Sequence, residues 1–378
     1  MNANQRFDAY LQEKLDERED NGLLRNLTTA TGKIDFSSND YLGFSQLNEF
    51  TKIEQEALAS GATGSRLITG NSLLAESTEK MIAAFHRAES ALIFNTGYMA
   101  NLGLFSCIAA RGDSFISDES IHASIIDGMR LSHANRYKFR HNDVDDLEKK
   151  LQLATGKKLV VIESIYSMDG DEAPIKSIIV LCKKYDALLI VDEAHATGIY
   201  GEKGEGLVCR DKLEEEVYAC VYTFGKAMGL HGAVITGSNV LRNYLVNFAR
   251  SFIYTTALPP HTYLQLEKAY KLLPGANRKS LFELIEYFRC ATQNIDGISF
   301  LNSHSPIQSV IIGDNFKAKA LAVQLFNQGI FVKAILSPTV PAGTERLRIC
   351  LHSFNTKGQV DQLIDIIKTA HRDIENGR

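Results

Sequence analysis

Two residues of this 378-residue chain have types and positions that predict a covalent cofactor site. Lys226 follows an apolar run at 219–222, and Asp192 ends another at 188–191. A lysine amine can hold the aldehyde of pyridoxal phosphate (PLP) as a Schiff base, and a carboxylate can keep the pyridine nitrogen protonated so that the ring accepts electrons. Two neighbouring parallel strands would deliver both groups to one crevice. The pair therefore predicts PLP as the cofactor.

The surroundings of the two residues favour this interpretation. Taken alone, Asp192 is equally well explained as a helix cap, and a lone lysine is most often a solvated charge. His195, however, lies three positions after Asp192 and could reach the phenolic oxygen of the cofactor while Asp192 pairs with the ring nitrogen. Glycines at 225, 229 and 232 allow the backbone to approach closely around Lys226.

A phosphate site is predicted at 95–101, Asn-Thr-Gly-Tyr-Met-Ala-Asn, which follows one strand-like run and opens a helix-like one. Gly97 and Tyr98 could offer backbone amides at a helix N-terminus, where anions are stabilised. By itself this segment reads as an ordinary capped turn. The nearby presence of a candidate lysine and aspartate favours phosphate.

The elements that must position these residues follow an alternating pattern. Continuously apolar runs at 91–94, 159–162, 187–191 and 232–235 are typical of parallel strands that are covered on both faces. The segment 175–184 places Ile178, Ile179 and Cys182 on one stripe and predicts a crossover helix. Polar residues fall at the carboxyl ends of the strands, where open parallel sheets bind ligands.

The domain organisation follows from a turn cluster at 272–277, which ends the alternating region. We predict an N-terminal segment, 1–45, that joins the smaller domain, a large α/β domain over 46–272, and a small α+β domain over 273–378. The fold class is therefore α/β, with a large, mostly parallel sheet and a smaller α+β domain.

The predicted small domain contains two strands, at 308–312 and 347–351, and a helix at 315–328. On a helical projection, an apolar face of this helix holds Phe316, Ala320, Val323 and Phe326.

Composition limits the class of protein. Hydrophobic residues make up 45% and charged residues 23%, which is ordinary for a globular enzyme, and the net charge of −4 gives no reason to expect a nucleic-acid partner. The six cysteines are scattered, without a Cys-x-x-Cys pair, a signal peptide or a stretch of membrane-spanning length. We therefore expect a reduced, cytoplasmic protein with no membrane and no metal site.

Six ordered motifs resemble those of the α-oxoamine synthases, and the resemblance runs from about Arg18 to the C-terminal helix. It implies a PLP-dependent transferase of fold type I, and an acyltransferase that condenses an amino acid with an acyl thioester and releases carbon dioxide. The motifs are Asn-Asp-Tyr-Leu-Gly at 39–43, Gly-Ser-Arg-Leu at 64–67, Asn-Thr-Gly-Tyr at 95–98, Ser-Met-Asp-Gly-Asp at 167–171, Asp-Glu-Ala-His-Ala-Thr-Gly at 192–198 and Thr-Phe-Gly-Lys at 223–226.

The resemblance implies roles for the residues around the cofactor. Lys226 would hold PLP, Asp192 would bind the ring nitrogen, and His195 and Ser167 would contact the phenolic oxygen. His122 would stack on the ring and help at the acyl carbonyl, whose developing oxyanion needs a donor.

The same resemblance implies a shared site in a homodimer. Gly97, Tyr98 and Thr223 would bind the phosphate, and Thr255 and Thr256 would reach it from the partner subunit.

Substrate roles are also implied by the resemblance. Arg348 matches the arginine that receives the amino-acid carboxylate, a role suited to a bidentate donor. Arg25 and Thr339 match positions assigned to the acyl substrate, and Asn39 is a further substrate-binding candidate. A surface charge at a strand edge is the alternative for Arg348, and a surface role stays open for Arg25 and Thr339.

Late segments, at 310–315 and 337–344, are most similar to the family member of biotin biosynthesis that joins L-alanine to a pimeloyl thioester. Whether coenzyme A or an acyl-carrier protein carries the acyl group stays open. Ala75 departs from the pattern, because relatives commonly have histidine there. This departure concerns acyl-chain or dimer contacts and leaves the cofactor residues complete.

Three alternatives remain. A sister synthase would use glycine with acetyl-CoA, or serine with a long acyl thioester, because one fold supports varied chemistry. A plain aminotransferase would convert an amino donor to its keto acid without releasing carbon dioxide. A non-catalytic subunit that kept the fold would be expected to lose Lys226, which is present here.

Overall fold

The computed structural model describes residues 1–50, 59–293, 295 and 297–375. Residues 51–58 of the predicted large domain lie outside the described residues. The chain forms two compact units. Unit 1 comprises Met1–Ser38, Met168–Gly170 and Lys279–Arg378, and unit 2 comprises Asn39–Ser167 and Asp171–Arg278.

The predicted domain ranges differ from the compact units at three places. Residues 39–45 and 273–278, which the sequence assigned to the smaller domain, lie in unit 2, and Met168–Gly170 lies in unit 1. The domain assignment itself stays a prediction.

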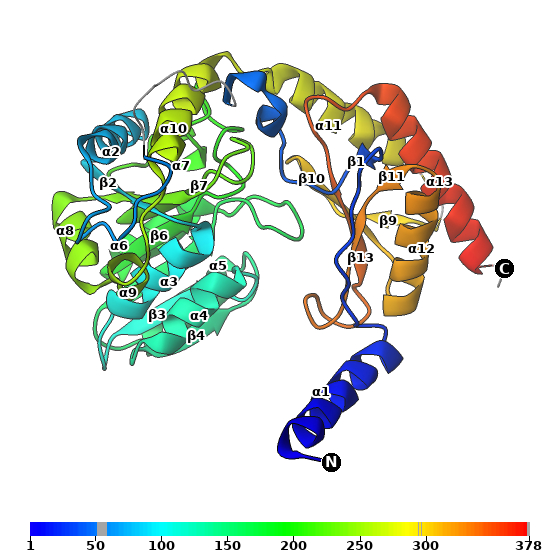
Figure 1. The fold of residues 1–378 in the computed structure, drawn as a ribbon, viewed down its shortest axis with the longest axis horizontal. Helices are drawn as coiled ribbons and strands as arrows, with labels where there is room; N and C mark the ends of the chain where they lie inside the picture. Colours follow the sequence, from blue (N-terminus) through cyan, green and yellow to red (C-terminus); the bar gives the residue numbers. More distant parts are fainter. Residues whose placement is uncertain (51–58, 294, 296, 376–378) are drawn as a thin grey trace. The chain divides into compact units, whose positions relative to one another are not determined.

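Unit 2 is built on a seven-stranded sheet in the order β2-β8-β7-β6-β5-β3-β4 (Figure 1). The four continuously apolar runs all form strands of this sheet. Its strands are β2 (Ser90–Phe94), β3 (Ser114–Asp118), β4 (Asn135–Phe139), β5 (Lys158–Glu163), β6 (Ala187–Asp192), β7 (Ala219–Thr223) and β8 (Ala233–Gly237).

Helices cover both faces of this sheet. Leu159 and Val161 of β5 belong to a core cluster with residues of α3, α4, α8 and α9, whereas the alternate residues Val160 and Ile162 are equally buried and point to the other face. The helices of unit 2 are α2 (Leu73–Phe85), α3 (Gly97–Cys107), α4 (Ala123–Leu131), α5 (Val144–Leu153), α6 (Ile175–Lys184), α7 (Leu207–Arg210), α8 (Asn239–Phe248), α9 (Arg250–Ile253) and α10 (Pro260–Leu272), with short 3-10 turns at Phe44–Gln46, Asn48–Phe50 and Leu273–Gly275. The predicted crossover helix is confirmed in α6, which buries Ile178, Ile179 and Cys182.

One strand direction was predicted wrongly. The run at 232–235 was expected to be parallel, but β8 pairs antiparallel with both β2 and β7. The connection from β7 to β8 contains only the turn around Lys226, and a parallel crossover needs a dozen or more residues.

Unit 1 combines two small sheets with three long helices at the C-terminal side. Strand β1 (Ile34–Asp35) pairs in parallel with β11 (Ile330–Phe331), and Cys350 donates its backbone N–H to the carbonyl oxygen of Phe36. A four-stranded antiparallel sheet has the order β12-β13-β10-β9. Its strands are β9 (Ser299–Phe300), β10 (Ile307–Ile311), β12 (Lys333–Ile335) and β13 (Arg346–Cys350), and the helices are α11 (Arg278–Thr292), α12 (Asn315–Asn327) and α13 (Lys357–Glu375).

The buried face of α12 was also predicted wrongly. Ala318, Leu321 and Leu325 face the core, whereas Phe316 and Val323 are more than half exposed. Both sets have helical spacing, so the pattern alone could not choose between them.

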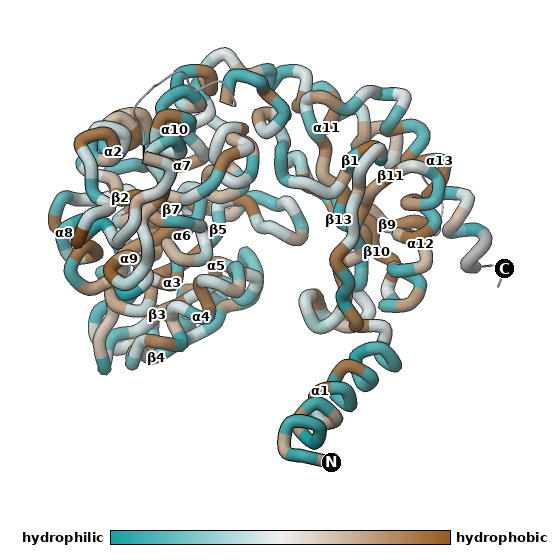
Figure 2. Tube along the Cα trace, viewed as in Figure 1, coloured by the Kyte–Doolittle hydropathy of each residue, from teal (hydrophilic) through white to brown (hydrophobic). Residues whose placement is uncertain are grey.

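Helix α1 (Ala3–Asp20) lies at the surface, because none of its residues is buried. Figure 2 shows it mostly in the hydrophilic colour, in contrast to the strands of the large sheet. Among the described residues, no helix combines the length and apolar character needed to cross a membrane.

Candidate active site

The carboxyl ends of β6 and β7 bring the two central residues of the sequence analysis into unit 2. The strands are parallel neighbours, with Asp192 paired to Val221. Asp192 is the last residue of β6, and Lys226 lies in the turn after β7. The prediction that neighbouring parallel strands deliver both residues is confirmed.

Lys226 belongs to a hydrogen-bonded chain. Its Nζ lies 2.9 Å from Nε2 of His195, and Nδ1 of His195 lies 2.8 Å from the hydroxyl of Tyr41. The Tyr41 hydroxyl donates to Oδ1 of Asn39 at 3.1 Å. Because that hydroxyl proton points to Asn39, Nδ1 of His195 donates to Tyr41, and Nε2 is left to accept a hydrogen bond from the lysine amine. The chain therefore fixes the tautomer of His195.

Asp192 is only 5% exposed and has donors on both oxygens. Oδ1 accepts the backbone N–H of Ala194 at 2.9 Å, and Oδ2 accepts from Nδ2 of Asn101 at 2.8 Å. A buried carboxylate is stable only when hydrogen bonds and an opposite charge compensate its lost hydration.

A second hydrogen-bonded chain joins Asp192 to His122. Nδ2 of Asn101 also donates to Oγ of Ser124 at 3.0 Å, and that hydroxyl lies 2.7 Å from Nδ1 of His122. The backbone N–H of Ser124 donates to the same Nδ1 at 3.2 Å, so this nitrogen is an acceptor. The ring proton of neutral His122 therefore resides on Nε2.

Electrostatics keep His122 neutral. Burial lowers the pKa of His122, and the nearby charge of Lys226 lowers it further, against the opposing effect of Asp192. These influences also place His122 within electrostatic reach of both residues. The ring is thus a neutral donor through Nε2.

The predicted phosphate segment opens α3. Thr96 caps this helix by accepting the N–H of Met99 at 3.1 Å, and the amides of Gly97 and Tyr98 lie in the first turn, where no intrahelical acceptor exists. A Cβ on Gly97 would lie 2.6 Å from Cγ2 of Thr223. Glycine is needed for this approach, which places Thr223 beside the N-terminus of the helix.

The remaining predicted residues of unit 2 lie around these strands. Ser167 is buried, and its backbone N–H donates to Oε2 of Glu163 at 3.2 Å. Thr255 and Thr256 follow α9, and the carbonyl oxygen of Thr256 accepts from Asn95 Nδ2 at 2.7 Å.

Three predicted substrate residues lie in unit 1. Arg348 is a buried residue of β13, opposite Ser309 of β10, and its Nη1 lies 2.9 Å from Sγ of Cys350. Arg25 and Thr339 line one cavity of about 680 Å³. Much of its wall is apolar and includes Val323 and Phe326, which explains the second apolar face of α12.

The charged residues that line the cavity in unit 1 are all cationic. Four of its lining residues are cationic, and none carries a carboxylate side chain; the cations are Arg18, Arg25, Lys319 and Lys333. Such a lining suits a ligand with an apolar chain and an anionic group.

Sequence reasoning assigned no role to Asn101, Ser124, Tyr41 or Glu163. Each contacts a predicted site residue through a side-chain hydrogen bond. Tyr41 and Asn101 lie in segments that the sequence analysis singled out, but their partners, His195 and Asp192, are distant in the chain. Ser124 and Glu163 contact residues only two and four positions away.

The residues of unit 2 fit PLP. The first-turn amides of Gly97 and Tyr98 could bind a phosphate, the buried carboxylate of Asp192 could be neutralised by a protonated pyridine nitrogen, and the amine of Lys226, beside His195, could bind an aldehyde. The close approach that Gly97 permits is the cradle that such a phosphate requires.

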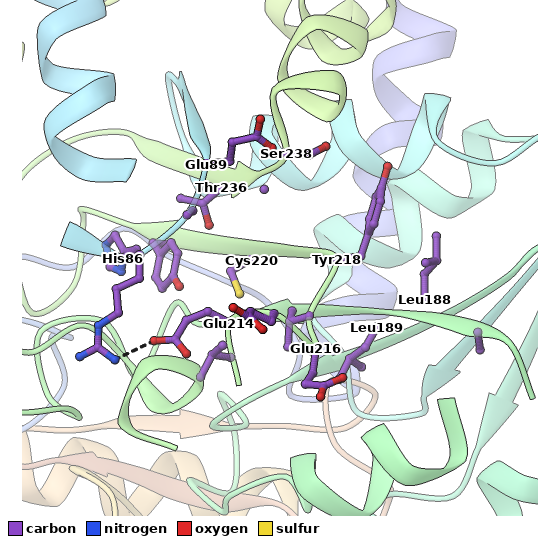
Figure 3. A pocket seen from close by; sticks show the side chains of 18 residues that line it. His86, Glu89, Leu188, Leu189, Glu214, Glu216, Tyr218, Cys220, Thr236 and Ser238 are labelled. Carbon is purple, nitrogen blue, oxygen red and sulfur yellow. Dashed lines mark hydrogen bonds and ion pairs between the residues drawn. The ribbon is translucent and has the colours of Figure 1, made fainter. Parts of the chain in front are cut away.

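A different cavity of about 550 Å³ lies at the opposite end of the same strands, beside Ala187 to Leu189 at the start of β6 (Figure 3). His86 lies in its wall, stacked on Tyr222 with ring centroids 3.7 Å apart. Nδ1 of His86 donates to the carbonyl oxygen of Glu205, and Nε2 accepts from the hydroxyl of Tyr270, both at 3.0 Å. Burial lowers the pKa of His86 to about 3.

We predict that His86 makes the protein sensitive to acid. Because its pKa is lower in the folded protein than the usual 6.5, its stabilising effect is complete above pH 6.5 and is lost as the pH falls. The loss is about 1.4 kcal/mol per pH unit, or about 2 kcal/mol between pH 6.5 and 5. Urea unfolding of wild type and His86→Gln at pH 7, 6 and 5 measures it; parallel losses in both proteins would contradict the prediction.

The chain is similar to known proteins over nearly its whole length. Residues 31–367 match the family model of class I and II aminotransferases. The 8-amino-7-oxononanoate synthase of Marinobacter nauticus is 42% identical over 344 residues, which cover 89% of this chain and 87% of that protein.

Solved structures extend the similarity to the fold. A variant of serine palmitoyltransferase from S. paucimobilis with bound PLP is 28% identical, with a TM-score of 0.89 and coverage of 99% of this chain and 100% of that one. An 8-amino-7-oxononanoate synthase from Francisella tularensis is 30% identical, with a TM-score of 0.75 and coverage of 91% and 98%.

Proposed function

This chain belongs to the class I and II aminotransferase family, within it to the 8-amino-7-oxononanoate synthases, and from that premise we propose how its residues act and on which substrates. It is a PLP-dependent acyltransferase of biotin biosynthesis with a fold of type I. The proposed reaction joins L-alanine to a pimeloyl thioester, forming a carbon–carbon bond and releasing carbon dioxide and the thiol carrier.

The observation that carries the proposal is the joint placement of Lys226, His195 and Asp192 at the ends of neighbouring strands. When bound, PLP supplies an electron sink for the bonding pair at Cα of the amino acid. Lys226 holds the cofactor and, once freed, takes the proton from Cα of alanine. Asp192 holds a proton at the pyridine nitrogen, with its own position fixed by Asn101.

Other residues of unit 2 orient the reacting groups. His195 keeps the Lys226 amine in place through Nε2, and with Ser167 it contacts the phenolic oxygen of the cofactor. The neutral ring of His122 presents Nε2–H to the acyl carbonyl, whose developing oxyanion needs a preformed donor.

The phosphate would be held by the first-turn amides of Gly97 and Tyr98 and by Thr223. Their closeness, which a side chain at Gly97 would prevent, supports this assignment.

The substrates would be bound largely by residues of unit 1. Arg348 would receive the carboxylate of alanine as a bidentate donor. Arg25 and Thr339 would bind the acyl substrate, and Asn39 stays a further substrate-binding candidate. The cavity that contains Arg25 and Thr339, with apolar walls and only cations as charged residues, supports this role.

Arg25→Ala is expected to raise the KM for pimeloyl-CoA about tenfold, since one charged hydrogen bond contributes about 1.5–3 kcal/mol. The KM for alanine should stay unchanged, because a separate arginine is assigned to that carboxylate. Steady-state kinetics with each substrate varied in turn checks the prediction, and Arg130→Ala, an exposed arginine of α4, serves as control. An equal rise in both KM values would remove Arg25 from the acyl site.

We also propose a cytoplasmic homodimer in which Thr255 and Thr256 reach the phosphate of the partner's site. The six free cysteines are compatible with a reducing compartment. Leu67, Ile68 and Tyr254 are more than half exposed on unit 2 and would gain from burial against a second copy. An acyl-carrier protein is the possible further partner.

A serine palmitoyltransferase activity is the second candidate, because that structure aligns with the higher TM-score. Sequence identity favours the alanine enzyme, at 42% against 28%. Substrate specificity depends on side chains more than on backbone shape, so we rank serine palmitoyltransferase activity second.

The test uses PLP-loaded protein with carboxyl-labelled alanine, glycine or serine, each with pimeloyl-CoA or palmitoyl-CoA. Release of labelled carbon dioxide that needs both alanine and pimeloyl-CoA supports the proposal. Release from serine with palmitoyl-CoA alone would select the second candidate. Conversion of alanine to pyruvate without carbon dioxide would favour an aminotransferase.

A further inference from the structure

Glu163 is a buried acid that the mechanism above does not use. It is the last residue of β5, is 3% exposed, and pairs in register with Asp192 at the end of β6. Its Oε2 accepts the backbone N–H of Ser167 at 3.2 Å. Within the described part of the chain, Oε1 has no hydrogen-bond partner and no contact with solvent.

Two acids side by side in a buried site do not both ionise readily. Asp192 receives one strong donor on each oxygen, from Ala194 and Asn101. Glu163 receives a single donor at hydrogen-bond distance, on one oxygen. The negative charge is more stable on the acid that accepts more hydrogen bonds, which is Asp192. The shared proton therefore resides on Glu163. With Oε2 accepting, that proton sits on Oε1.

The charges around Glu163 agree with this assignment. Burial and the neighbouring Asp192 raise the pKa of Glu163 to about 8, against the opposing effects of Lys226 and of the backbone N–H groups of His122 and Ser167. Among the described residues, the titratable groups that interact with Glu163 are Asp192 at the end of β6, Lys226 in the turn after β7 and Tyr166 in the segment after β5. At neutral pH the side chain is therefore an uncharged acid.

We propose that Glu163 is a proton-bearing positioning residue of the PLP site, which holds the backbone at Ser167 in place and keeps a second negative charge away from Asp192. The inference rests on the PLP site of the proposed function. An ionised Glu163 would compete with Asp192 for the cation of the ring nitrogen. A neutral Glu163 leaves Asp192 as the sole partner of that nitrogen and offers Oε1–H as a donor inside the site.

Glu163→Gln tests the protonation, because an amide has the shape of the neutral acid and cannot ionise. A proton held more tightly in the folded than in the unfolded protein makes stability fall as the pH rises from about 4.5 to about 8. The Tm of the PLP-loaded variant minus that of wild type should therefore grow by a few degrees between pH 5.5 and 8, then level off. A difference that stays constant over this range would overturn the proposal.

The positioning role is tested by PLP affinity, measured by fluorescence titration at pH 7. Glu163→Gln should keep the wild-type affinity, because its amide can still accept from Ser167. The side chain of Glu163→Leu cannot accept this hydrogen bond, so this variant should bind PLP about tenfold more weakly. Equal affinities for the two variants would overturn the positioning role, even if the pH dependence holds.

Glu193→Gln is the matched control. Glu193 is also buried, burial raises its pKa to about 7, and its Oε2 accepts the N–H of Leu207 at 2.7 Å, away from Ser167 and His122. This control should show a similar pH-dependent gain in Tm with no change in PLP affinity. If wild type itself binds no PLP, the proposed function fails, whereas the Tm difference still reports on the proton of Glu163.

Discussion

Replacement of Lys226 by alanine is expected to reduce turnover by about 10⁴-fold or more, the scale that follows removal of a covalent catalytic group. The amine both holds the cofactor and moves the Cα proton, so one substitution removes two functions. Borohydride reduction should fix PLP to the wild-type protein at Lys226 and leave the variant unlabelled in mass spectrometry.

Lys226→Arg distinguishes the positive charge of Lys226 from its ability to form the covalent link to PLP. Arginine keeps a cation that can donate to His195, but it stays protonated and cannot form the covalent link. We expect it to be as inactive as the alanine variant and to remain folded. Turnover within tenfold of wild type for either variant would contradict the assignment of Lys226.

Removal of the Glu79 side chain is expected to lower the free energy of unfolding by about 3–5 kcal/mol, because it leaves a buried cation without its anionic partner. Glu79 of α2 pairs with Arg66 at 2.8 Å and with Arg242 at 3.1 Å, and its Oε1 also accepts the N–H of Ile93 at 3.0 Å. The side chains of Glu79 and Arg66 are 3% and 7% exposed. Glu79→Ala therefore leaves the buried guanidinium of Arg66 without its carboxylate partner and the backbone N–H of Ile93 without its acceptor.

Denaturant unfolding of Glu79→Ala beside Glu148→Ala measures this cost. Glu148 of α5 pairs with Lys184 at 2.6 Å, but the lysine is 60% exposed. A surface pair of that kind contributes at most about 1 kcal/mol. Similar losses in the two variants would show that burial of Glu79 does not determine its contribution.

Strands β2, β5, β6, β7 and β8 could be located from the sequence because a strand covered on both faces is typically apolar at every position, which is a local property. Strands β3 and β4, which include polar residues, were not predicted. The direction of β8 is not local. It follows from the short turn that carries Lys226, and a count of connecting residues would have corrected it. The face of α12 could not be chosen, because its second apolar stripe lines a cavity and so mimics a core face.

For the candidate site as well, some residues could be predicted from the sequence and others could not. Lys226, Asp192 and His195 could be proposed because their residue types and motifs point to one cofactor. The hydrogen bonds of Asn101 to Asp192 and of Tyr41 to His195 join segments far apart in the chain. An asparagine or a tyrosine has no chemical signature of its own, so only the folded chain reveals these contacts.

The pairing of β1 with β11 has a consequence for synthesis on the ribosome. Ile34 and Asp35 emerge before unit 2 is made, whereas their partners Ile330 and Phe331 follow after it. Unit 2, which lies almost wholly between them in the chain, can close first, since domains generally fold as they emerge. A nascent chain halted before residue 330 should therefore have a protease-resistant unit 2 while strand β1 is still cleaved. Strand β1, although made before unit 2, would then pair only after unit 2 has folded.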